Sequence, residues 1–503
     1  MNYSTFLPLL MSILLPAFAN HRRSILDILT RHGSLLLQDV LAFLSEPVTP
    51  TTTLDFEHKI SARLREIGRA LCEFACNQLE GDDPNALPRH ILFEAAEYRI
   101  LNKKTHQQVD GLFGPMHVRR HLYRPVDKQS GESVIAPLMQ SLGVVANTTP
   151  ALAEVIGRHL AATGSTQKTV QDRVRKDHGV TIGTQRLREL AGHLSEKMRA
   201  VRQEFQIRRL LELLEQANRS RGNRKPVLSV GRDGITLREY DHSLYEVAST
   251  GTVTVLDRAG KPLGSVYLAF APELGQSQMT DQMTGLIEGV LRDWEGPLPR
   301  LAYVTDAGDN EVRYYERVLR GMIHPRTGEK LAWQRVVDFY HAMERVWTMA
   351  GVLFGEKSRE AKSWARKMGG LLKKPNGPFR VLHSAAALRA GRKLSPANQK
   401  AYRQAYNYIR ERTEWMQYHE YKKQHLPIGS GITEAACKTI FTQRLKLSGM
   451  RWSKAGAQVI LDLRVVLLSG IWDKVYRHVL MLSTYNQLRI PEGEVEMPMQ
   501  MAA

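Results

Sequence analysis

Three carboxylate residues occupy positions where side chains often do chemistry. Asp233 lies near the end of the apolar run "VLSVGRDGITL", Asp306 ends the run "RLAYVTD", and Glu434 lies in the first turn of a helix that follows "PIGSG". Carboxylates about 4 Å apart repel by roughly 4 kcal/mol per pair at an effective dielectric near 20, so a cluster of them needs cations. Oxygen ligands select Mg²⁺, with Mn²⁺ as a substitute. A pair of such ions can activate one oxygen and stabilise another in phosphodiester chemistry.

Each carboxylate also has a purely structural interpretation. Asp233 precedes a glycine, and Asp-Gly is a common turn pair. Asp306 could cap the helix that follows it, and Asp309 competes with it as a ligand. Thr433 is expected to cap the helix that carries Glu434, whose carboxylate could serve only the helix dipole.

An α/β pattern supplies the elements that would position these side chains. From residue 227, three meandering strands precede a helix, a fourth strand that ends at Asp306, another helix and a fifth strand. This order predicts an RNase H-like mixed sheet, in which the first and fourth strands are neighbours and bring Asp233 towards Asp306. We predict that residues 227–350 and 426–480 form the two parts of this core, and that residues 481–503 form a tail.

Residues 351–425 interrupt the core with a predicted helical insertion. They contain 17 Lys and Arg against 5 Asp and Glu, a net charge of +12 out of +19 for the whole chain. A merely solvated helical face would mix the two signs more evenly. The insertion is therefore a candidate surface for DNA phosphates.

The first 226 residues are predicted to be mostly α-helical. We divide them into a helical region (1–97), a small β-containing segment (98–150), a helix-turn-helix region (151–200) and a linker helix (201–226). A capped helix that ends at Gly179, followed by a second helix from Thr184, is the layout of a DNA-binding helix-turn-helix. Its second helix would read DNA through Gln185, Arg186 and Arg188. The alternative is an ordinary helical hairpin.

The composition favours a polyanionic partner in a reducing compartment. The net charge of +19 fits nucleic acid better than a membrane, since no apolar run in the sequence is long enough to span one. Three cysteines form no disulfide framework, so we expect a cytoplasmic, nucleoid-associated protein. The N-terminal apolar run with its Ala17-Phe18-Ala19 pattern resembles a signal peptide. Its basic residues follow the run instead of preceding it, which favours a buried helix.

Four motifs resemble the catalytic core of bacterial insertion-sequence transposases of the ISKra type, in the Mutator-like group of DDE transposases. They are "GRDG", "VTDAGDNE", "VVDFYHAMERVW" and "PIGSGITEAACK…RLKLSGMRW", and the likeness covers roughly residues 225–475. It implies that Asp233, Asp306 and Glu434 bind the metal ions. It also matches a Cys-or-Asp, two residues, His motif to Asp338 and His341, and the group's helical insertion to residues 351–425.

Several nearby residues are further candidates. His341 would share a helical turn with Asp338 and reach a metal-bound water or a phosphate, or it could be a core residue. Trp452 could stack on a base, although core packing is the simpler use. Lys438 could contact phosphate or pair with Glu434 along the helix. The predicted DNA contacts after Glu434 are Lys438, Arg444, Lys446 and Arg451.

Together these observations predict a DNA transposase. It would bind terminal inverted repeats, cleave DNA with Mg²⁺ to expose a 3′-OH, and transfer that hydroxyl to target DNA as a homodimer or larger assembly. The alternatives are an RNase H-like nuclease without strand transfer and a catalytically inert DNA-binding regulator. Many relatives carry a cysteine zinc ribbon; the corresponding "RRHLYRPVDKQSGESVIAPL" has no cysteine, so no zinc is predicted.

Overall fold

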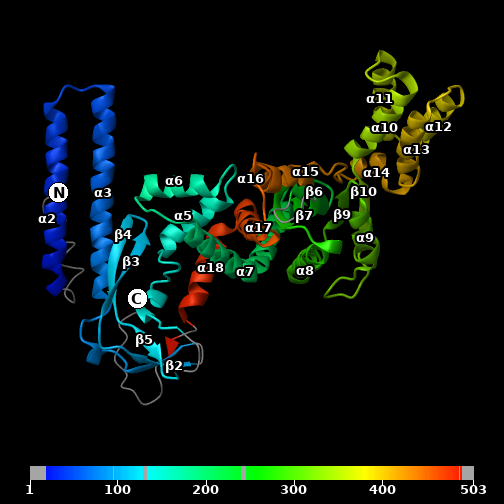
Figure 1. Ribbon diagram of the computed structural model, residues 1–503. Helices are drawn as coiled ribbons and strands as arrows, with labels where there is room; N and C mark the ends of the chain where they lie inside the picture. Colours follow the sequence, from blue (N-terminus) through cyan, green and yellow to red (C-terminus); the bar gives the residue numbers. More distant parts are fainter. Residues whose placement is uncertain (1–18, 94–95, 128–132, 239–244, 486–487, 490–503) are drawn as a thin grey trace. The chain divides into compact units, whose positions relative to one another are not determined.

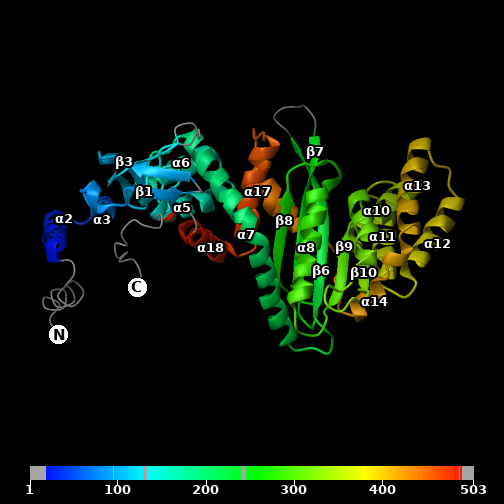
Figure 2. The ribbon, with the colours of Figure 1, turned by 90° about the horizontal axis from the view of Figure 1, so that it is seen from below.

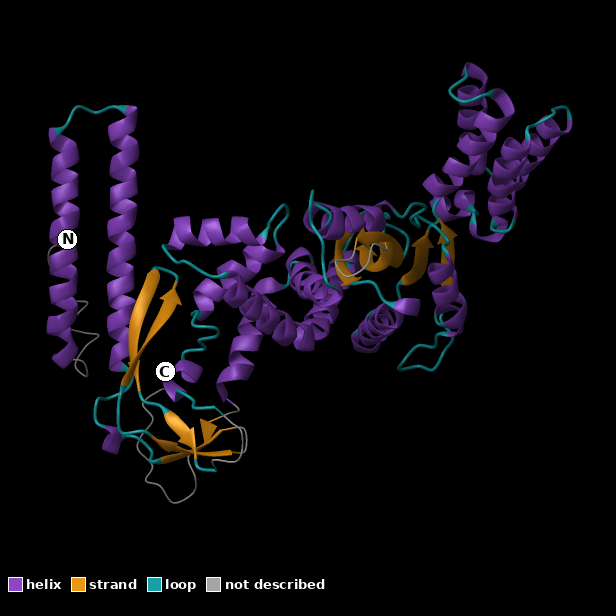
Figure 3. Ribbon diagram, in the orientation of Figure 1, coloured by secondary structure: helices purple, strands orange, loops and turns teal. Residues whose placement is uncertain are grey.

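The computed structural model describes residues 19–93, 96–127, 133–238, 245–485 and 488–489 (Figure 1). The protein is mixed α/β and 58% helical, so its sheets are the minority that must place the site (Figure 3). The apolar run that ends at Ala17-Phe18-Ala19 lies outside the described residues except for Ala19. Most of the predicted tail, residues 481–503, also lies outside them. No described helix is by itself long and apolar enough to cross a bilayer.

The chain divides into two compact units. Unit 1 comprises residues 1–160, 166–193 and 476–503, and unit 2 comprises residues 161–165 and 194–475. The helices of unit 1 are α2 (Ala19–Ser45), α3 (Pro50–Gln78), η1 (Pro84–Ala86), α4 (Pro137–Ser141), α5 (Pro150–Ala161), α6 (Gln167–His178), the start of α7 (Thr184–Asn218) and most of α18 (Trp472–Tyr485). Its strands are β1 (His90–Phe93), β2 (Ala96–Ile100), β3 (Thr105–Gly111), β4 (Gly114–Arg120), β5 (Tyr123–Pro125) and β11 (Leu488–Arg489).

Unit 1 contains one small sheet and one separate hairpin. Among the described strands, the sheet has the order β11-β1-β2-β5, and β3 pairs with β4. Helices α6 and α7 lie where the sequence predicts them. Thr166 caps α6 through the backbone N–H of Thr169, and Gly179 ends the helix with a left-handed φ of 67°.

Unit 2 is built around a mixed five-stranded sheet, which confirms the predicted mixed sheet. Its strands are β6 (Val227–Arg238), β7 (Tyr245–Leu256), β8 (Pro262–Phe270), β9 (Arg300–Thr305) and β10 (Trp333–Val337), in the order β10-β9-β6-β7-β8. The first three strands pair antiparallel, whereas β9 runs parallel to both β6 and β10. The predicted neighbourhood of the first and fourth strands is therefore present.

Helices cover both faces of this sheet, and Figure 2 views it towards one of them. The C-terminal part of α7 and helix α8 (Ser277–Asp293) pack on one face through an apolar core that includes Leu213, Leu286 and Val230. On the other face, α10 (Phe339–Phe354) joins the β9–β10 side to the helices of residues 351–425. The other helices of unit 2 are η2 (Leu274–Gln276), α9 (Asp309–Arg317), η3 (Leu319–Gly321), α11 (Arg359–Leu372), α12 (Gly377–Ala390), α13 (Pro396–Arg410), η4 (Thr413–Trp415), α14 (Tyr418–Lys423), α15 (Gly431–Cys437), the π-helix η5 (Lys438–Thr442), α16 (Gln443–Leu445) and α17 (Lys454–Leu468).

Candidate metal centre

Strand register places three aspartates at one edge of the sheet. Val230 of β6 pairs with Tyr303 of β9. Asp233 lies on β6 three residues after Val230, and Asp306 lies three residues after Tyr303, just past the end of β9. Val337 of β10 pairs with Thr305, so Asp338 follows its strand at the level of Asp306. Parallel strands carry such residues to the same edge, which is where acidic side chains from distant segments can meet.

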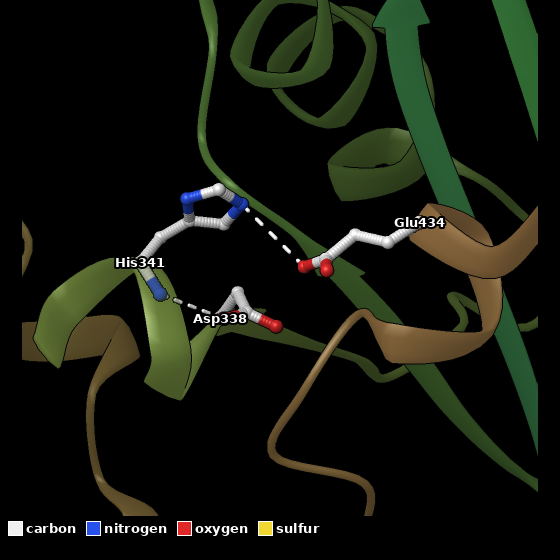
Figure 4. Close-up of side chains that lie close together, drawn as sticks. All are labelled: Asp338, His341 and Glu434. Carbon is white, nitrogen blue, oxygen red and sulfur yellow. Dashed lines mark hydrogen bonds and ion pairs between the residues drawn. The ribbon is translucent and has the colours of Figure 1, made fainter. Parts of the chain in front are cut away.

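Asp338, His341 and Glu434 form a group that could hold a metal ion. Each offers one ligand atom, and these atoms lie within 4.8 Å of one another. The Nε2 atom of His341 is 3.6 Å from Oε1 of Glu434. Figure 4 shows these two side chains pointing towards each other from α10 and α15, with Asp338 beside them. Carboxylate oxygens and an imidazole suit several divalent cations, so the group does not by itself identify the metal.

Asp338 is also a structural brace. It is fully buried, and its Oδ1 accepts hydrogen bonds from the backbone N–H groups of Tyr340 (2.6 Å) and His341 (2.9 Å). Its Oδ2 accepts a hydrogen bond from the backbone N–H of Ser430. One carboxylate therefore caps α10 and fastens it to the segment that leads into Glu434.

Helix α15 is held against the sheet by small and polar side chains. The predicted cap at Thr433 is wrong: α15 begins at Gly431, and Thr433 is buried with its hydroxyl 2.7 Å from that of Thr252. The Thr433 side chain packs against β7 of the sheet and is therefore not directed to the start of α15. The Ser430 hydroxyl donates to Oε1 of Glu434 at 3.1 Å, which orients the carboxylate.

Gly231 is required for this close approach. A Cβ atom at that position would lie 2.0 Å from the Thr433 hydroxyl oxygen. We expect Gly231→Ala to displace α15 and to destabilise the protein by about 1–3 kcal/mol, the usual cost of overpacking. Urea denaturation measures this loss, and the added substitution Thr433→Ala should restore part of it. Wild-type stability in Gly231→Ala would contradict the packing described here.

Asp233 and Asp306 lie beside this group but outside its 4.8 Å limit. Oδ1 of Asp233 accepts from the N–H of Gly234 at 2.7 Å, and its Oδ2 accepts from the Cys437 thiol at 3.2 Å. Burial raises the pKa of Asp233, and the charge of Asp306 adds to that effect. The two predicted aspartates are thus close enough to interact electrostatically.

A sharp turn and a hydrogen bond from the insertion hold Asp306. Ala307 has a φ of 61°, which is rare for a residue with a side chain, and Oδ1 of Asp306 accepts from the N–H of Gly308 at 3.0 Å. Tyr408 of α13 donates its hydroxyl to the Asp306 carbonyl oxygen at 2.6 Å. The competing residue, Asp309, is exposed in the first turn of α9.

Burial and nearby acids have opposing effects on the pKa of His341. Burial lowers its pKa, but the hydrogen bond and charge of Glu344 and the charges of Asp338 and Asp306 outweigh burial, so the pKa is raised overall. An imidazolium at this position would offset part of the negative charge of Glu434.

Glu311 is an additional acid that the sequence analysis did not identify. It is 7% exposed, and burial, followed by the charges of Asp306 and Asp233, raises its pKa to about 7. The sequence signal is its position five residues after Asp306, on the helix that leaves the same strand. Since the charges of Asp306 and Asp233 act on it, Glu311 lies near these two acids.

The pKa of Glu311 predicts a pH-dependent stability. Because the folded-state pKa of about 7 exceeds the reference value of 4.5, its stabilising contribution is complete below pH 4.5 and is lost as the pH rises through 7. Glu311→Gln should therefore gain stability over the wild type between pH 5 and pH 8, by about 3 kcal/mol at most. Urea denaturation in EDTA at both pH values measures the difference. The exposed control Glu329→Gln should show none, and an equal response of the two variants would refute the assignment.

The predicted DNA contacts divide into exposed and buried residues. Lys438, Lys446 and Arg451 are exposed. Arg444 is only 1% exposed and lies 5.4 Å from the ring centre of Trp452, so its predicted role as a surface DNA contact is wrong. It is buried because α16 turns it into the interior. Trp452 donates its indole N–H to the carbonyl of Leu445 at 2.9 Å, which fits packing.

Two of the three residues predicted to contact DNA at the start of α7 are exposed to solvent. Gln185 and Arg188 are exposed. Arg186 is partly buried and forms an ion pair with the buried Asp110. Arg186 therefore already supports unit 1 internally, whereas Gln185 and Arg188 are available to a partner.

Neither a protein-family profile nor a curated protein sequence matches this chain. The residues of the site are therefore the guide to what this protein does.

Proposed function

We propose that this protein is a DDE transposase similar to those of the ISKra type, with an RNase H-like catalytic core. The observation that carries the proposal is the gathering of Asp233, Asp306, Asp338, His341 and Glu434 at one edge of the sheet. The strand order β10-β9-β6-β7-β8, with one antiparallel meander and two parallel strands, supports an RNase H-like core. These residues come from segments separated by up to about 200 positions.

The donor set fits hard divalent cations. Asp233, Asp306 and Glu434 are the proposed Mg²⁺ ligands, and their oxygens are the ligand type that Mg²⁺ and Mn²⁺ prefer. When bound, these ions would make an oxygen nucleophile more reactive and stabilise the leaving oxygen. The protein's own residues orient this set: Ser430 holds Glu434, the Cys437 thiol holds Asp233, and the turn at Ala307 holds Asp306.

DNA binding is proposed for three basic surfaces. The first is the helix-turn-helix interpretation of α6 and α7, with Gln185 and Arg188 directed to terminal inverted repeats. The second is the set of exposed residues Lys438, Lys446 and Arg451 next to Glu434. The third is the insertion at residues 351–425, whose net charge of +12 suits phosphates. Two element ends would be joined to target DNA by a homodimer or a larger assembly.

A strand-transfer assay tests the proposal. Purified protein is incubated with Mg²⁺, target DNA and DNA that carries the two ends of the element encoding it, and the products are sequenced. We expect nicks that leave 3′-OH ends, followed by joining to the target. Nicking without joining would favour the nuclease alternative, and DNA binding without any cleavage would favour the inert regulator.

A further inference from the structure

The helical hairpin formed by α2 and α3 packs little apolar surface of its own. The two helices, of 27 and 29 residues, contact each other through the stacked rings of Phe43 and Phe56, 4.1 Å apart, and through the ion pair of Arg63 with Asp39 at 2.7 Å. No residue of α3 is buried. Figure 1 shows both helices as long rods. Helices of this composition normally gain most of their stability from a packed apolar face, so the hairpin is incomplete by itself.

One side of α2 carries an exposed apolar stripe. We define the outer stripe as Leu37, Leu41, Leu44 and Val48, with exposed fractions of 58%, 54%, 72% and 73%. Leu37, Leu41 and Leu44 are spaced four and three residues apart, which places them along one side of α2, and Val48 lies in the loop that joins α2 to α3. Single exposed leucines are ordinary on protein surfaces, but a contiguous row of them marks an interaction surface.

An apolar groove of about 720 Å³ lies next to the outer stripe. Its lining includes Leu36, Val40, Phe56, Ile60 and Leu64 from the hairpin, together with Phe113. Leu36 and Val40 each precede a stripe residue by one position, so groove and stripe adjoin on α2. A surface that carries both a ridge and a groove can pair with a copy of itself about a two-fold axis.

The charge of the hairpin argues for a protein partner. Residues 19–79 contain 7 Lys and Arg and 7 Asp and Glu, a net charge of zero in a chain of +19. Such a surface has no excess charge to attract phosphates, and two copies of it do not repel each other. A helix of 27 residues is about 40 Å long and 10 Å wide. The two helices of the hairpin, side by side, therefore present a face of about 800 Å², the usual share of one partner in a stable complex.

We propose that the α2–α3 hairpin is the dimerisation surface of this protein and that its occupant is the hairpin of a second copy. The outer stripe of each copy packs on the groove of the other and forms a four-helix arrangement. The inference deepens the proposed function, because it supplies the contact by which two catalytic centres would hold two DNA ends. The contact itself needs neither DNA nor metal.

Sedimentation analysis of the full-length protein without DNA tests this surface. We expect the wild type to dimerise at micromolar concentration, and Leu41→Glu with Leu44→Glu to raise the dimer dissociation constant by at least about 100-fold. The matched control is Leu274→Glu, which changes a fully exposed leucine outside the hairpin. Circular dichroism should show equal helix content in all three proteins. A monomeric wild type, or a double variant that dimerises like the wild type, would overturn the proposal.

Disulfide trapping gives a second measurement. Leu41→Cys, mixed with a copy that carries Ile60→Cys in its groove, should form a covalent dimer under mild oxidation, whereas Leu274→Cys mixed with Ile60→Cys should not. Equal cross-linking of the two variants, or wild-type association with lipid vesicles in place of dimerisation, would argue against the surface. Dimers that fail to cleave DNA would refute only the proposed function, and cleavage and joining by a strict monomer would refute only the dimer.

Discussion

Glu434→Gln is expected to lower the proposed Mg²⁺-dependent DNA cleavage by about 10³-fold or more while the proposed DNA binding persists. The substitution keeps the size of the side chain and removes the charge that faces His341 at 3.6 Å and that a cation would need. A loss of 10³-fold corresponds to about 4 kcal/mol of transition-state stabilisation, a reasonable loss for a group that acts on the reacting atoms. Cleavage rates with Mg²⁺ and with Mn²⁺, together with DNA affinity at fixed salt, measure the effect.

Glu344→Gln is the matched control for this prediction. Glu344 also contacts His341, through Nδ1 at 3.1 Å, but its side chain is 64% exposed and lies outside the group of candidate ligands. We expect its loss to change cleavage by no more than about 10-fold, the lower end of effects seen when a partner of a ligand is removed. Equal losses in both variants would mean that Glu434 acts only through His341. Full activity in Glu434→Gln would remove it from the catalytic set.

Asp338→Asn is expected to lower cleavage by about 100-fold by loosening the segment that carries Glu434. The amide oxygen of asparagine can still accept the N–H groups of Tyr340 and His341, but its NH₂ group would face the N–H of Ser430. A buried donor left without an acceptor costs about 1–3 kcal/mol, and small displacements of catalytic groups cost about 100-fold in rate. Hydrogen exchange of a peptide spanning residues 426–433 should increase, and urea denaturation should show the lost stability.

The control for Asp338 is Asp309→Asn. Asp309 also follows a strand closely, in the first turn of α9, but its side chain is exposed, so exchange and stability should stay near those of the wild type. Mn²⁺ affinity separates the two possible roles of Asp338. If Asp338 acts by holding the segment that leads into Glu434, Asp338→Asn should retain most of its Mn²⁺ affinity. If Asp338 is a metal ligand, the variant should lose as much Mn²⁺ affinity as Glu434→Gln, with unchanged hydrogen exchange at Ser430.

Local sequence patterns were sufficient for the elements and for part of the site. The apolar runs and the helical spacing predicted the strands that carry Asp233 and Asp306, the helices on either side of Gly179, and the mixed sheet in which β6 and β9 are neighbours. These features depend on interactions between residues close in sequence, or on the few ways that such elements can be arranged. The same patterns put Glu434 in the first turn of its helix, where it is found.

Tertiary structure decided how individual side chains are used. Arg444 lies within a basic run but is buried, Thr433 packs on the sheet instead of capping α15, and Glu311 is enclosed near Asp306. None of these outcomes follows from neighbouring residues, because burial is set by elements that pack from elsewhere in the chain.

The sequence by itself determined which acids stand at strand ends and that residues 351–425 carry a net charge of +12 out of +19. Only the tertiary structure decided that Asp338 and His341, which share a helical turn, meet Glu434, since the hydrogen bond of Asp338 to Ser430 spans 92 positions. Periodicity reports which side of an element is apolar, whereas the partner of a buried polar group is chosen by the three-dimensional path of the backbone.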